Sequence, residues 1–338
     1  MYNVLNIQSK VSDYRLGFVD SLSPIQALME QDNTITIIDS NVNELYPALQ
    51  RQSNIVLDSH EGAKTLKGSE ILLNALKDRK ANIRTTLVVI GGGILQDLVG
   101  FCASIYCRGI DYILVPTTLL AQTDSCVGGK TSINLDNRKN LLGTFYPPKE
   151  IVIYTKFLET LPNPDYLSGM GEIYKFHILQ DNIKQFDVES FVEPMILDGL
   201  TYKVDILSRD EFDKGERRFL NYGHTFGHAL ESISNHKIPH GLGVVLGCMI
   251  ATRIAKKLQY AIQDYSAIIA KGVYLIHKSK LKLQPEWFDP KSLLEIVKSD
   301  KKSTGQLTMV LVDHKPFLEN VENSRIVEEA LKEVYESI

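Results

Sequence analysis

The sequence lacks the long apolar runs and the strong net charge that would place a protein in a membrane or on nucleic acid. No stretch approaches the about 18 to 20 apolar residues of a membrane span, and the first 20 residues carry polar side chains every few positions, unlike a signal peptide. Lysine and arginine number 37 against 41 aspartate and glutamate, a formal net charge of −4. We therefore expect neither a membrane nor a nucleic acid as partner, and any anion site must be a local cluster.

Cysteine is also scarce. The chain of 338 residues has four cysteines, which stand among apolar or small residues: Cys102, Cys107, Cys126 and Cys248. With 44% hydrophobic residues, a chain of this length can bury a sizeable core without a disulfide framework. We therefore expect free thiols and a reducing, cytoplasmic compartment.

Short β-branched runs alternate with helical patterns in the first half of the chain, which is typical of βαβ units around a mostly parallel sheet. The segments predicted as buried strands are 34–40, 53–59, 85–93 and 111–118. Beyond a proline-punctuated stretch at 147–164, apolar residues recur mainly at spacings of three and four, with a short strand expected at 307–313. The pattern predicts an α/β domain over residues 1–155 and a mainly helical domain over residues 156–338.

A glycine turn follows the third predicted strand. Gly92 and Gly93 come after the apolar run 87–90, and Asp97 stands one turn later. Such a turn lets the backbone approach a pyrophosphate at a helix N-terminus, although the GxGxxG spacing is absent and an ordinary tight turn has the same signature. Polar residues after two other strands favour the dinucleotide interpretation, because carboxyl ends of parallel strands share one sheet edge. These residues are Asp39, Glu61 and Lys64.

Segment 117–148 is rich in glycine and polar side chains. Its string VGGKTS resembles a phosphate loop, but no glycine stands five residues before Gly129, so the GxxxxGK[ST] pattern of nucleoside triphosphatases is not met. The backbone amides and lysines of the segment suit a phosphate or carboxylate on a small substrate. The candidate contacts are Asp124, Lys130, Lys139 and Asn140, of which Lys139 is equally well explained as a surface charge.

Histidines mark a possible metal site in the second half. His224 and His228 are four residues apart, a spacing that places two imidazoles on one helix face, and Glu172 lies in an earlier predicted helix. The third imidazole is His240 or His236. This donor set suits a catalytic zinc or cobalt ion, whereas the missing HExxH glutamate leaves an ordinary helix pair as the alternative. Donors for an anionic substrate precede the same helix: Lys203, Arg217 and Asn221.

Together these segments resemble the 3-dehydroquinate synthase family of sugar phosphate cyclases over residues 35–310. The matching strings are GGGILQDLVGF, YCRGIDYILVPTTLLAQTDSCVGGKTSIN, RKNLLGTFYPP, SGMGEIYKF, and RDEFDKGERRFLNYGHTFGHALES followed by HG. The resemblance implies an N-terminal Rossmann-like α/β domain that binds NAD, a mainly helical C-terminal domain that binds zinc or cobalt, and an active site in the cleft between them. It also implies conversion of 3-deoxy-D-arabino-heptulosonate 7-phosphate to 3-dehydroquinate and phosphate, in the shikimate pathway of aromatic amino acid biosynthesis.

The resemblance also assigns roles residue by residue. The metal ligands fall on Glu172, His224 and His240, which leaves His228 beside the metal as a candidate for proton transfer. Substrate contacts fall on Asp124, Lys130, Asn140, Lys175, Lys203, Arg217 and Asn221, with Lys139 close by. Cofactor contacts fall on Asp39, Glu61, Lys64, Gly92, Gly93, Asp97, Thr117 and Thr118. Arg108 matches an arginine that reaches the substrate phosphate of the neighbouring subunit, which implies a homodimer.

Among the substrate contacts, Lys130 and Lys175 are expected at the phosphate, and Lys203 and Arg217 at the carboxylate. A carboxylate contact argues against valiolone- and inosose-type sugar phosphate cyclases and against an NAD- and metal-dependent alcohol dehydrogenase, although these alternatives stay open. A cyclase of the amino-dehydroquinate type, whose substrate is also carboxylated, stays open as well. A non-catalytic protein on the same scaffold is a further alternative.

Three departures from the family pattern suggest a divergent branch. The usual HGEAV string reads HGLGV, so Leu242 replaces an acid expected to orient the metal-binding histidine. The loop 300–305 is one residue shorter than usual, which leaves the substrate lysine open between Lys301 and Lys302. The segment 312–324 also differs from the usual tail.

Overall fold

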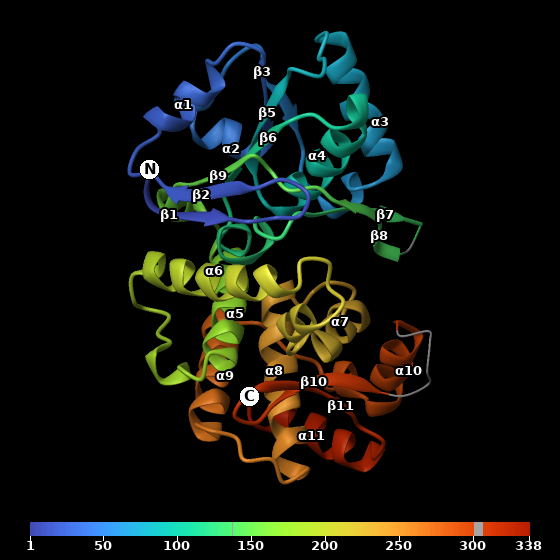
Figure 1. Cartoon of the computed structure of the whole chain (residues 1–338). Helices are drawn as coiled ribbons and strands as arrows, with labels where there is room; N and C mark the ends of the chain where they lie inside the picture. Colours follow the sequence, from blue (N-terminus) through green and yellow to red (C-terminus); the bar gives the residue numbers. More distant parts are fainter. Residues whose placement is uncertain (137, 301–306) are drawn as a thin grey trace. The chain divides into compact units, whose positions relative to one another are not determined.

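The computed structural model of the protein describes residues 1–136, 138–300 and 307–338. The chain forms two compact units (Figure 1). Unit 1 consists of Met1–Leu161 with Lys203–Phe212, and unit 2 consists of Pro162–Tyr202 with Asp213–Ile338. Within the described ranges, no helix is both long enough and apolar enough to cross a membrane.

A seven-stranded sheet in the order β1-β2-β9-β6-β5-β3-β4 is the frame of unit 1. Its strands are β1 (Tyr2–Ile7), β2 (Tyr14–Phe18), β3 (Thr34–Asp39), β4 (Ile55–Leu57), β5 (Thr86–Gly91), β6 (Tyr112–Pro116) and β9 (Glu150–Ile153). All neighbours pair in parallel except β1, which runs antiparallel to β2. The predicted parallel sheet and its four strands are therefore confirmed, while β1, β2 and β9 extend it beyond the prediction.

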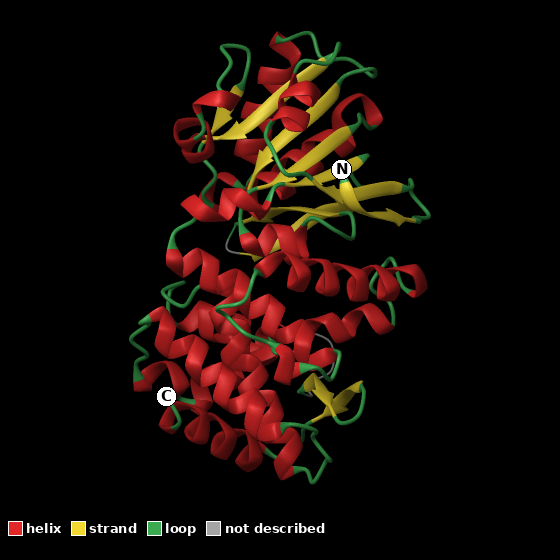
Figure 2. Cartoon of the chain, turned by 90° about the vertical axis from the view of Figure 1, so that its left-hand side faces the viewer, coloured by secondary structure: helices red, strands yellow, loops and turns green. Residues whose placement is uncertain are grey.

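Helices cover this sheet because its central strands are apolar on both faces, as parallel strands usually are. Val88 and Ile90 of β5 are fully buried in a core cluster that includes Ile25 and Val42 from α1 (Ser23–Met29) and α2 (Ser40–Leu45). Leu87 and Val89 alternate with them and are also fully buried, and α4 (Gly93–Ile105) contacts β5 and β6. Figure 2 shows the strands side by side with helices packed against them.

The remaining elements of unit 1 lie mostly in the connections. They are α3 (Leu66–Asp78), the antiparallel hairpin β7 (Lys130–Leu135) and β8 (Arg138–Phe145), the π-helical turn η4 (Ala121–Ser125), and the 3₁₀ turns η1 (Pro47–Leu49), η2 (Glu61–Ala63), η3 (Tyr106–Arg108) and η5 (Thr155–Thr160). The chain's four cysteines are free, as predicted, although Cys107 is exposed whereas the other three are buried.

Over its described residues, unit 2 is a helical bundle with a small hairpin. The apolar spacing predicts the helices and the strand at 307–313, whereas the second strand of the hairpin was not predicted. Its elements are α5 (Asn163–Leu179), η6 (Ile183–Gln185), α6 (Val192–Arg209), η7 (Glu216–Asn221), α7 (His224–Ile233), α8 (His240–Lys257), α9 (Tyr265–Ser279), η8 (Pro285–Phe288), α10 (Pro290–Asp300), β10 (Thr308–Val312), β11 (Pro316–Asn320) and α11 (Ser324–Glu336). Helix α6 belongs to unit 2 up to Tyr202 and to unit 1 from Lys203. Helix α8 is the centre of the bundle, with contacts to α5, α7, α9 and α11.

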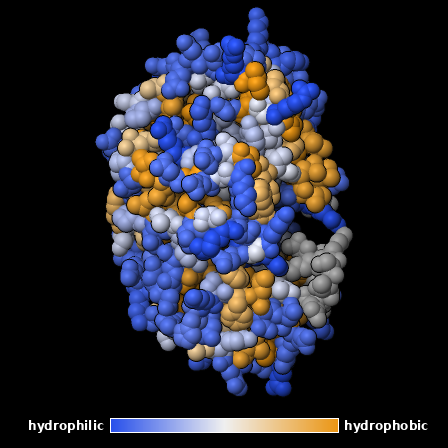
Figure 3. Space-filling view, in the orientation of Figure 1, coloured by the Kyte–Doolittle hydropathy of each residue, from blue (hydrophilic) through white to orange (hydrophobic). Residues whose placement is uncertain are grey.

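The surface is mixed in polarity. Figure 3 shows hydrophobic residues in small groups between hydrophilic ones on the face in view. Single exposed apolar side chains of this kind, such as Ile83 and Phe191, are normal for a globular protein.

Glycines allow α5 and α8 to touch through their backbones. A Cβ atom on Gly241 would lie 1.7 Å from the carbonyl oxygen of Ser168, and one on Gly171 would lie 2.2 Å from the carbonyl oxygen of Gly241. The amide of Gly241 also donates a hydrogen bond to Ser168 Oγ at 2.9 Å. This contact fixes the start of α8 against the middle of α5, where Glu172 is located.

We expect Gly241→Ala to lower the free energy of unfolding by about 1–3 kcal/mol, because the added methyl group forces the two helices apart. Urea unfolding followed by circular dichroism measures the change. Gly243→Ala is the matched comparison on the same helix. Its added Cβ would lie 3.0 Å from the nearest atom, against 1.7 Å for Gly241, so a smaller loss is expected. Equal losses in the two variants would contradict this packing argument.

Candidate active site

The predicted cofactor residues lie at one edge of the sheet in unit 1. Strands β4, β3, β5 and β6 are consecutive neighbours and run parallel, so their carboxyl ends share that edge. The chain runs from β3 outward to β4 and then returns to β5, which lies on the other side of β3. The strand order therefore reverses between β3 and β5. Such a topological switch point is the usual ligand position in parallel sheets. The residues at this edge are Asp39, Glu61, Lys64, Gly92, Gly93, Thr117 and Thr118.

The glycine turn is held tightly against the neighbouring loop. The amide of Thr117 donates to the Gly91 carbonyl oxygen at 3.2 Å, and a Cβ on Gly92 would lie 3.0 Å from Thr118 Cγ2. Gly92 is the N-cap of α4 and provides no side chain to cap it. The first amides of this helix are therefore suited to an anion such as a pyrophosphate.

Asp39 also has a structural role that the sequence interpretation did not include. Its Oδ1 accepts hydrogen bonds from the amides of Asn41 at 2.9 Å and Val42 at 3.2 Å, which caps α2. These bonds hold the carboxylate in a fixed orientation at the end of β3. Its contact with a ribose stays a prediction.

A polar cluster connects the cofactor residues to the β7–β8 hairpin. Lys64 Nζ donates to Asp97 Oδ2 at 2.8 Å and to Asn140 Oδ1 at 2.5 Å. Ser132 Oγ lies 3.0 Å and 2.9 Å from the same two oxygens. Desolvation raises the pKa of Asp97 although the ammonium of Lys64 opposes this shift. Residues predicted to bind cofactor and substrate thus share one cluster, which also contains Ser132, a residue that sequence reasoning missed.

Lys203 pairs with Asp124 within unit 1. Its Nζ donates to the Asp124 carbonyl oxygen at 2.6 Å and to Asp124 Oδ1 at 2.9 Å, and its side chain is almost fully buried. Asp124 lies on the π-helical turn η4, a rare conformation that is often found at functional sites. The structure therefore brings these two predicted substrate contacts together.

The other predicted residues of unit 1 are exposed. Lys130 begins β7 and Lys139 lies on β8. Arg108 is exposed in a left-handed stretch, with φ values of 50°, 67° and 122° at Cys107, Arg108 and Gly109. The contacts of these three side chains with a substrate stay predictions.

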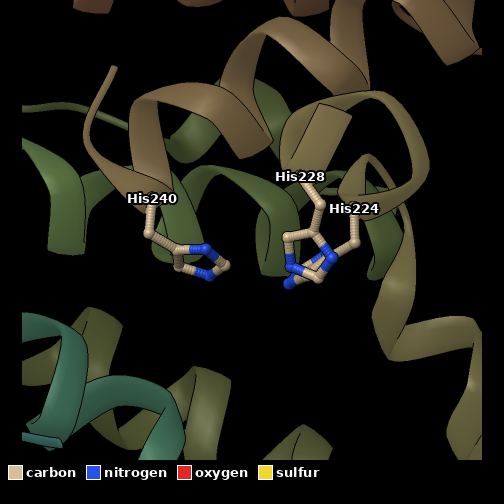
Figure 4. Close-up of side chains that lie close together, drawn as sticks. All are labelled: His224, His228 and His240. Carbon is tan, nitrogen blue, oxygen red and sulfur yellow. The ribbon is translucent and has the colours of Figure 1, made fainter. Parts of the chain in front are cut away.

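Three imidazoles converge in unit 2 (Figure 4). His224 and His228 come from one face of α7, and His240 is the first residue of α8. Each offers a ring nitrogen that lies within 4.8 Å of the others. His240 and not His236 therefore joins the pair, which resolves the alternative left open by the sequence.

Glu172 completes this cluster from α5. Its side chain is fully buried, and its Oε1 lies 3.1 Å from His240 Nε2 and 3.5 Å from His224 Nε2. The Nδ1–H of His224 donates to the carbonyl oxygen of Tyr222 at 3.1 Å, so its Nε2 faces the carboxylate. Two nitrogens and one carboxylate oxygen thus converge as a zinc- or cobalt-type donor set, and these residues fit a divalent ion.

Lys175 lies against the same carboxylate. Its Nζ is 2.5 Å from Glu172 Oε2, and its side chain is 1% exposed. Although desolvation opposes ionisation, the ammonium of Lys175 and the two imidazoles hold the pKa of Glu172 well below its ordinary value. Lys175 therefore favours the ionised form of the Glu172 carboxylate. The contact of Lys175 with a substrate phosphate stays a prediction.

The pKa values of His240 and His228 are shifted in opposite directions. Desolvation acts against the charged form of His240, but its hydrogen bonds with Glu172 and Glu231 raise its pKa to about 10. For His228, desolvation and the neighbouring rings of His224 and His240 all lower the pKa. This shift favours the neutral ring that a proton acceptor needs.

A pocket of about 330 Å³ adjoins His224 and His228 within unit 2. One wall is polar and comes from η7 and α7, while Val297, Val310 and Leu318 form an apolar wall. The polar lining includes the predicted Asn221 together with Arg218, Thr225 and Thr308, which the motifs did not indicate. Arg217 is buried beside Arg218. Lys301 and Lys302 lie outside the described residues.

We expect the protein to bind one divalent ion per chain at this cluster. Glu172→Gln and His224→Ala each remove a donor and should weaken zinc or cobalt binding by about 100-fold or more. Isothermal titration and the visible spectrum of the cobalt form measure the loss. His236→Ala is the control and should bind as the wild type does; equal weakening in this variant would contradict the assignment.

Comparison with known proteins agrees with this geometry. Family models described as 3-dehydroquinate synthase N-terminal and C-terminal match residues 54–168 and 169–303. The 3-dehydroquinate synthase of Alkaliphilus metalliredigens (strain QYMF) is 37% identical over 294 residues, which cover 81% of this chain and 82% of the relative. That of Alkaliphilus oremlandii (strain OhILAs) is 34% identical over 331 residues, covering 92% and 90%.

A solved structure shows a similar fold over the whole chain. It is 2-deoxy-scyllo-inosose synthase complexed with carbaglucose-6-phosphate, NAD+ and Co2+, with a TM-score of 0.83, 27% identity, and coverage of 98% of this chain and 99% of the other. The resemblance inferred from the motifs is thereby confirmed.

Proposed function

The chain belongs to the 3-dehydroquinate synthase family, and we propose that it converts 3-deoxy-D-arabino-heptulosonate 7-phosphate to 3-dehydroquinate and phosphate. The observation that carries this proposal is the approach of Glu172 to His224 and His240, a donor set for one divalent ion, with the ring of His228 beside them. The dinucleotide-type edge of unit 1 supports it. The surrounding pathway is then the shikimate pathway of aromatic amino acid biosynthesis.

The proposed cofactors are NAD and zinc or cobalt. NAD+ and Co2+ are named in the complex of the related inosose synthase, and this chain has residues that suit both groups. When bound, NAD supplies reversible hydride transfer and the metal supplies Lewis acidity. Because the reaction as a whole is redox-neutral, hydride must return to the substrate in each turnover.

The chain's own residues bind the substrate and move its protons. Lys203 and Arg217 are proposed to bind the substrate carboxylate, with Asp124 orienting the ammonium of Lys203. His228 is proposed to accept and return a proton through its neutral ring. The proposed phosphate contacts are Lys130, Lys175 and, from a neighbouring copy, Arg108. Asn140 and Asn221 are further proposed substrate contacts, with Lys139 nearby.

The proposed cofactor contacts are the residues of the sheet edge. Gly92 and Gly93 bring the N-terminus of α4 to the pyrophosphate. Asp39 is proposed to bind the adenine ribose, and the remaining contacts are Glu61, Lys64, Asp97, Thr117 and Thr118. Lys64 bonds both Asp97 and Asn140 and so connects the proposed cofactor contacts to the β7–β8 hairpin.

We also propose a cytoplasmic homodimer. Four free cysteines support a reducing compartment. The exposed Arg108 in its left-handed turn supports a role toward a second copy.

The related cyclases are the second candidate, because an inosose synthase shares the fold at a TM-score of 0.83. A neutral sugar phosphate needs no contact for a carboxylate. Lys203 and Arg217, both nearly buried, favour the heptulosonate.

The first test is phosphate release from the heptulosonate phosphate by metal-loaded protein with a catalytic amount of NAD. We expect 3-dehydroquinate as the product by NMR and no steady rise in NADH absorbance. Conversion of the added NAD to NADH without phosphate release would indicate a dehydrogenase instead. Absence of phosphate release from protein shown to bind NAD and metal would favour another sugar phosphate.

Lys203→Ala tests the carboxylate contact. Loss of a charged hydrogen-bond donor is expected to lower kcat/KM by about 10- to 100-fold. Fluorescence titration of NAD should show little change, which separates substrate binding from damage to the fold. Lys149→Ala, which removes an exposed partner of Asp111, serves as the control. Turnover by Lys203→Ala at the rate of this control would disprove the assignment.

A further inference from the structure

A second carboxylate contacts the metal cluster from the far side of His240. Glu231 Oε1 lies 2.9 Å from His240 Nδ1, and Glu231 is 8% exposed. Glu231 stands seven residues after His224 and three after His228 on α7, so all three share one helix face. Helix α7 therefore carries two imidazoles of the cluster together with the group that contacts the third.

The contact determines which nitrogen of His240 faces Glu172. An ionised carboxylate has no proton to donate, so it can only accept. Nδ1 of His240 therefore carries the proton of its hydrogen bond with Glu231. The opposite nitrogen, Nε2, lies 3.1 Å from Glu172 Oε1. A hydrogen bond of this kind fixes both the ring orientation and the tautomer of an imidazole ligand, and raises its basicity.

The sequence places an apolar residue where an orienting acid was expected. Leu242 follows His240 by two residues and is 1% exposed within α8. The contact between α7 and α8 brings Glu231 to the histidine instead. The helices approach closely here, since a Cβ on Gly227 would lie 2.9 Å from the Gly243 carbonyl oxygen, and a Cβ on Gly243 would lie 3.4 Å from Glu231 Cγ.

We propose that Glu231 is the positioning residue for His240, which sets the orientation and tautomer of this imidazole and thereby the affinity of the metal site. The inference rests on the proposed metal centre. In this inference, Glu231 of α7 orients His240, a role that the family pattern gives to an acid at position 242.

The test is the affinity of the purified full-length protein for cobalt. Glu231→Ala is expected to weaken binding 10- to 100-fold and to alter the visible spectrum of the cobalt form. Glu231→Gln, which keeps the shape but loses the charge, is expected to lie between Glu231→Ala and the wild type. Glu333→Gln is the matched control, because it removes a carboxylate that pairs with Arg253 and Lys257 of α8, neither of which is a proposed metal ligand.

Two further readouts separate positioning from a general structural role. Nitrogen-15 NMR of histidine in the zinc form should show His240 protonated at Nδ1 in the wild type, with its Nδ1 signal shifted in Glu231→Gln. Urea unfolding of the metal-free variants shows whether the helices still pack, and Glu231→Gln covers the case in which Glu231→Ala does not fold.

Cobalt affinities of both Glu231 variants within twofold of the wild type would overturn the inference while leaving the metal centre intact. An Nδ1 signal of His240 that does not change in Glu231→Gln would overturn it as well. Failure of the wild-type protein to bind cobalt would overturn both the metal centre and the role of Glu231.

Discussion

The buried carboxylate of Glu172 is the constraint on which the helical unit depends. A fully buried charge is strongly unfavourable unless ionic and hydrogen-bonding partners surround it. Here the partners come from three helices: Lys175 from α5 itself, His224 from α7 and His240 from α8. The same contacts that stabilise the charge therefore fix the three helices and bring the metal donors together.

Backbone proximity makes this arrangement possible. Helices α5 and α8 touch where Gly171 and Gly241 have no side chains, so the short reach of a glutamate and an imidazole is sufficient. In unit 1 the corresponding constraint is strand order, because parallel strands place the ends of β4, β3, β5 and β6 at one edge. One site is thus determined by helix packing and the other by sheet topology.

Much of this could be predicted from the sequence because it follows local periodicity. Apolar runs predicted the central strands, and a spacing of four residues placed His224 and His228 on one helix face. Contacts between distant segments carry no such signal. By spacing alone both His236 and His240 fit, and the family resemblance pointed to His240. The packing of α7 on α8 brings His240 to the pair. Glu231 was missed because its spacing from His224 is shared by any amphipathic helix, and Ser132 because an isolated serine in a strand has no distinguishing pattern.

The most direct measurement follows the fate of the hydride during turnover. We propose that NAD oxidises the hydroxyl at C5 of the heptulosonate phosphate. Substrate labelled with deuterium at C5 is converted by metal-loaded protein with catalytic NAD, and the product is examined by NMR and mass spectrometry. The account predicts that 3-dehydroquinate retains the label at the corresponding carbon. Transfer of the label into accumulating NADH, or its loss to solvent, would contradict it.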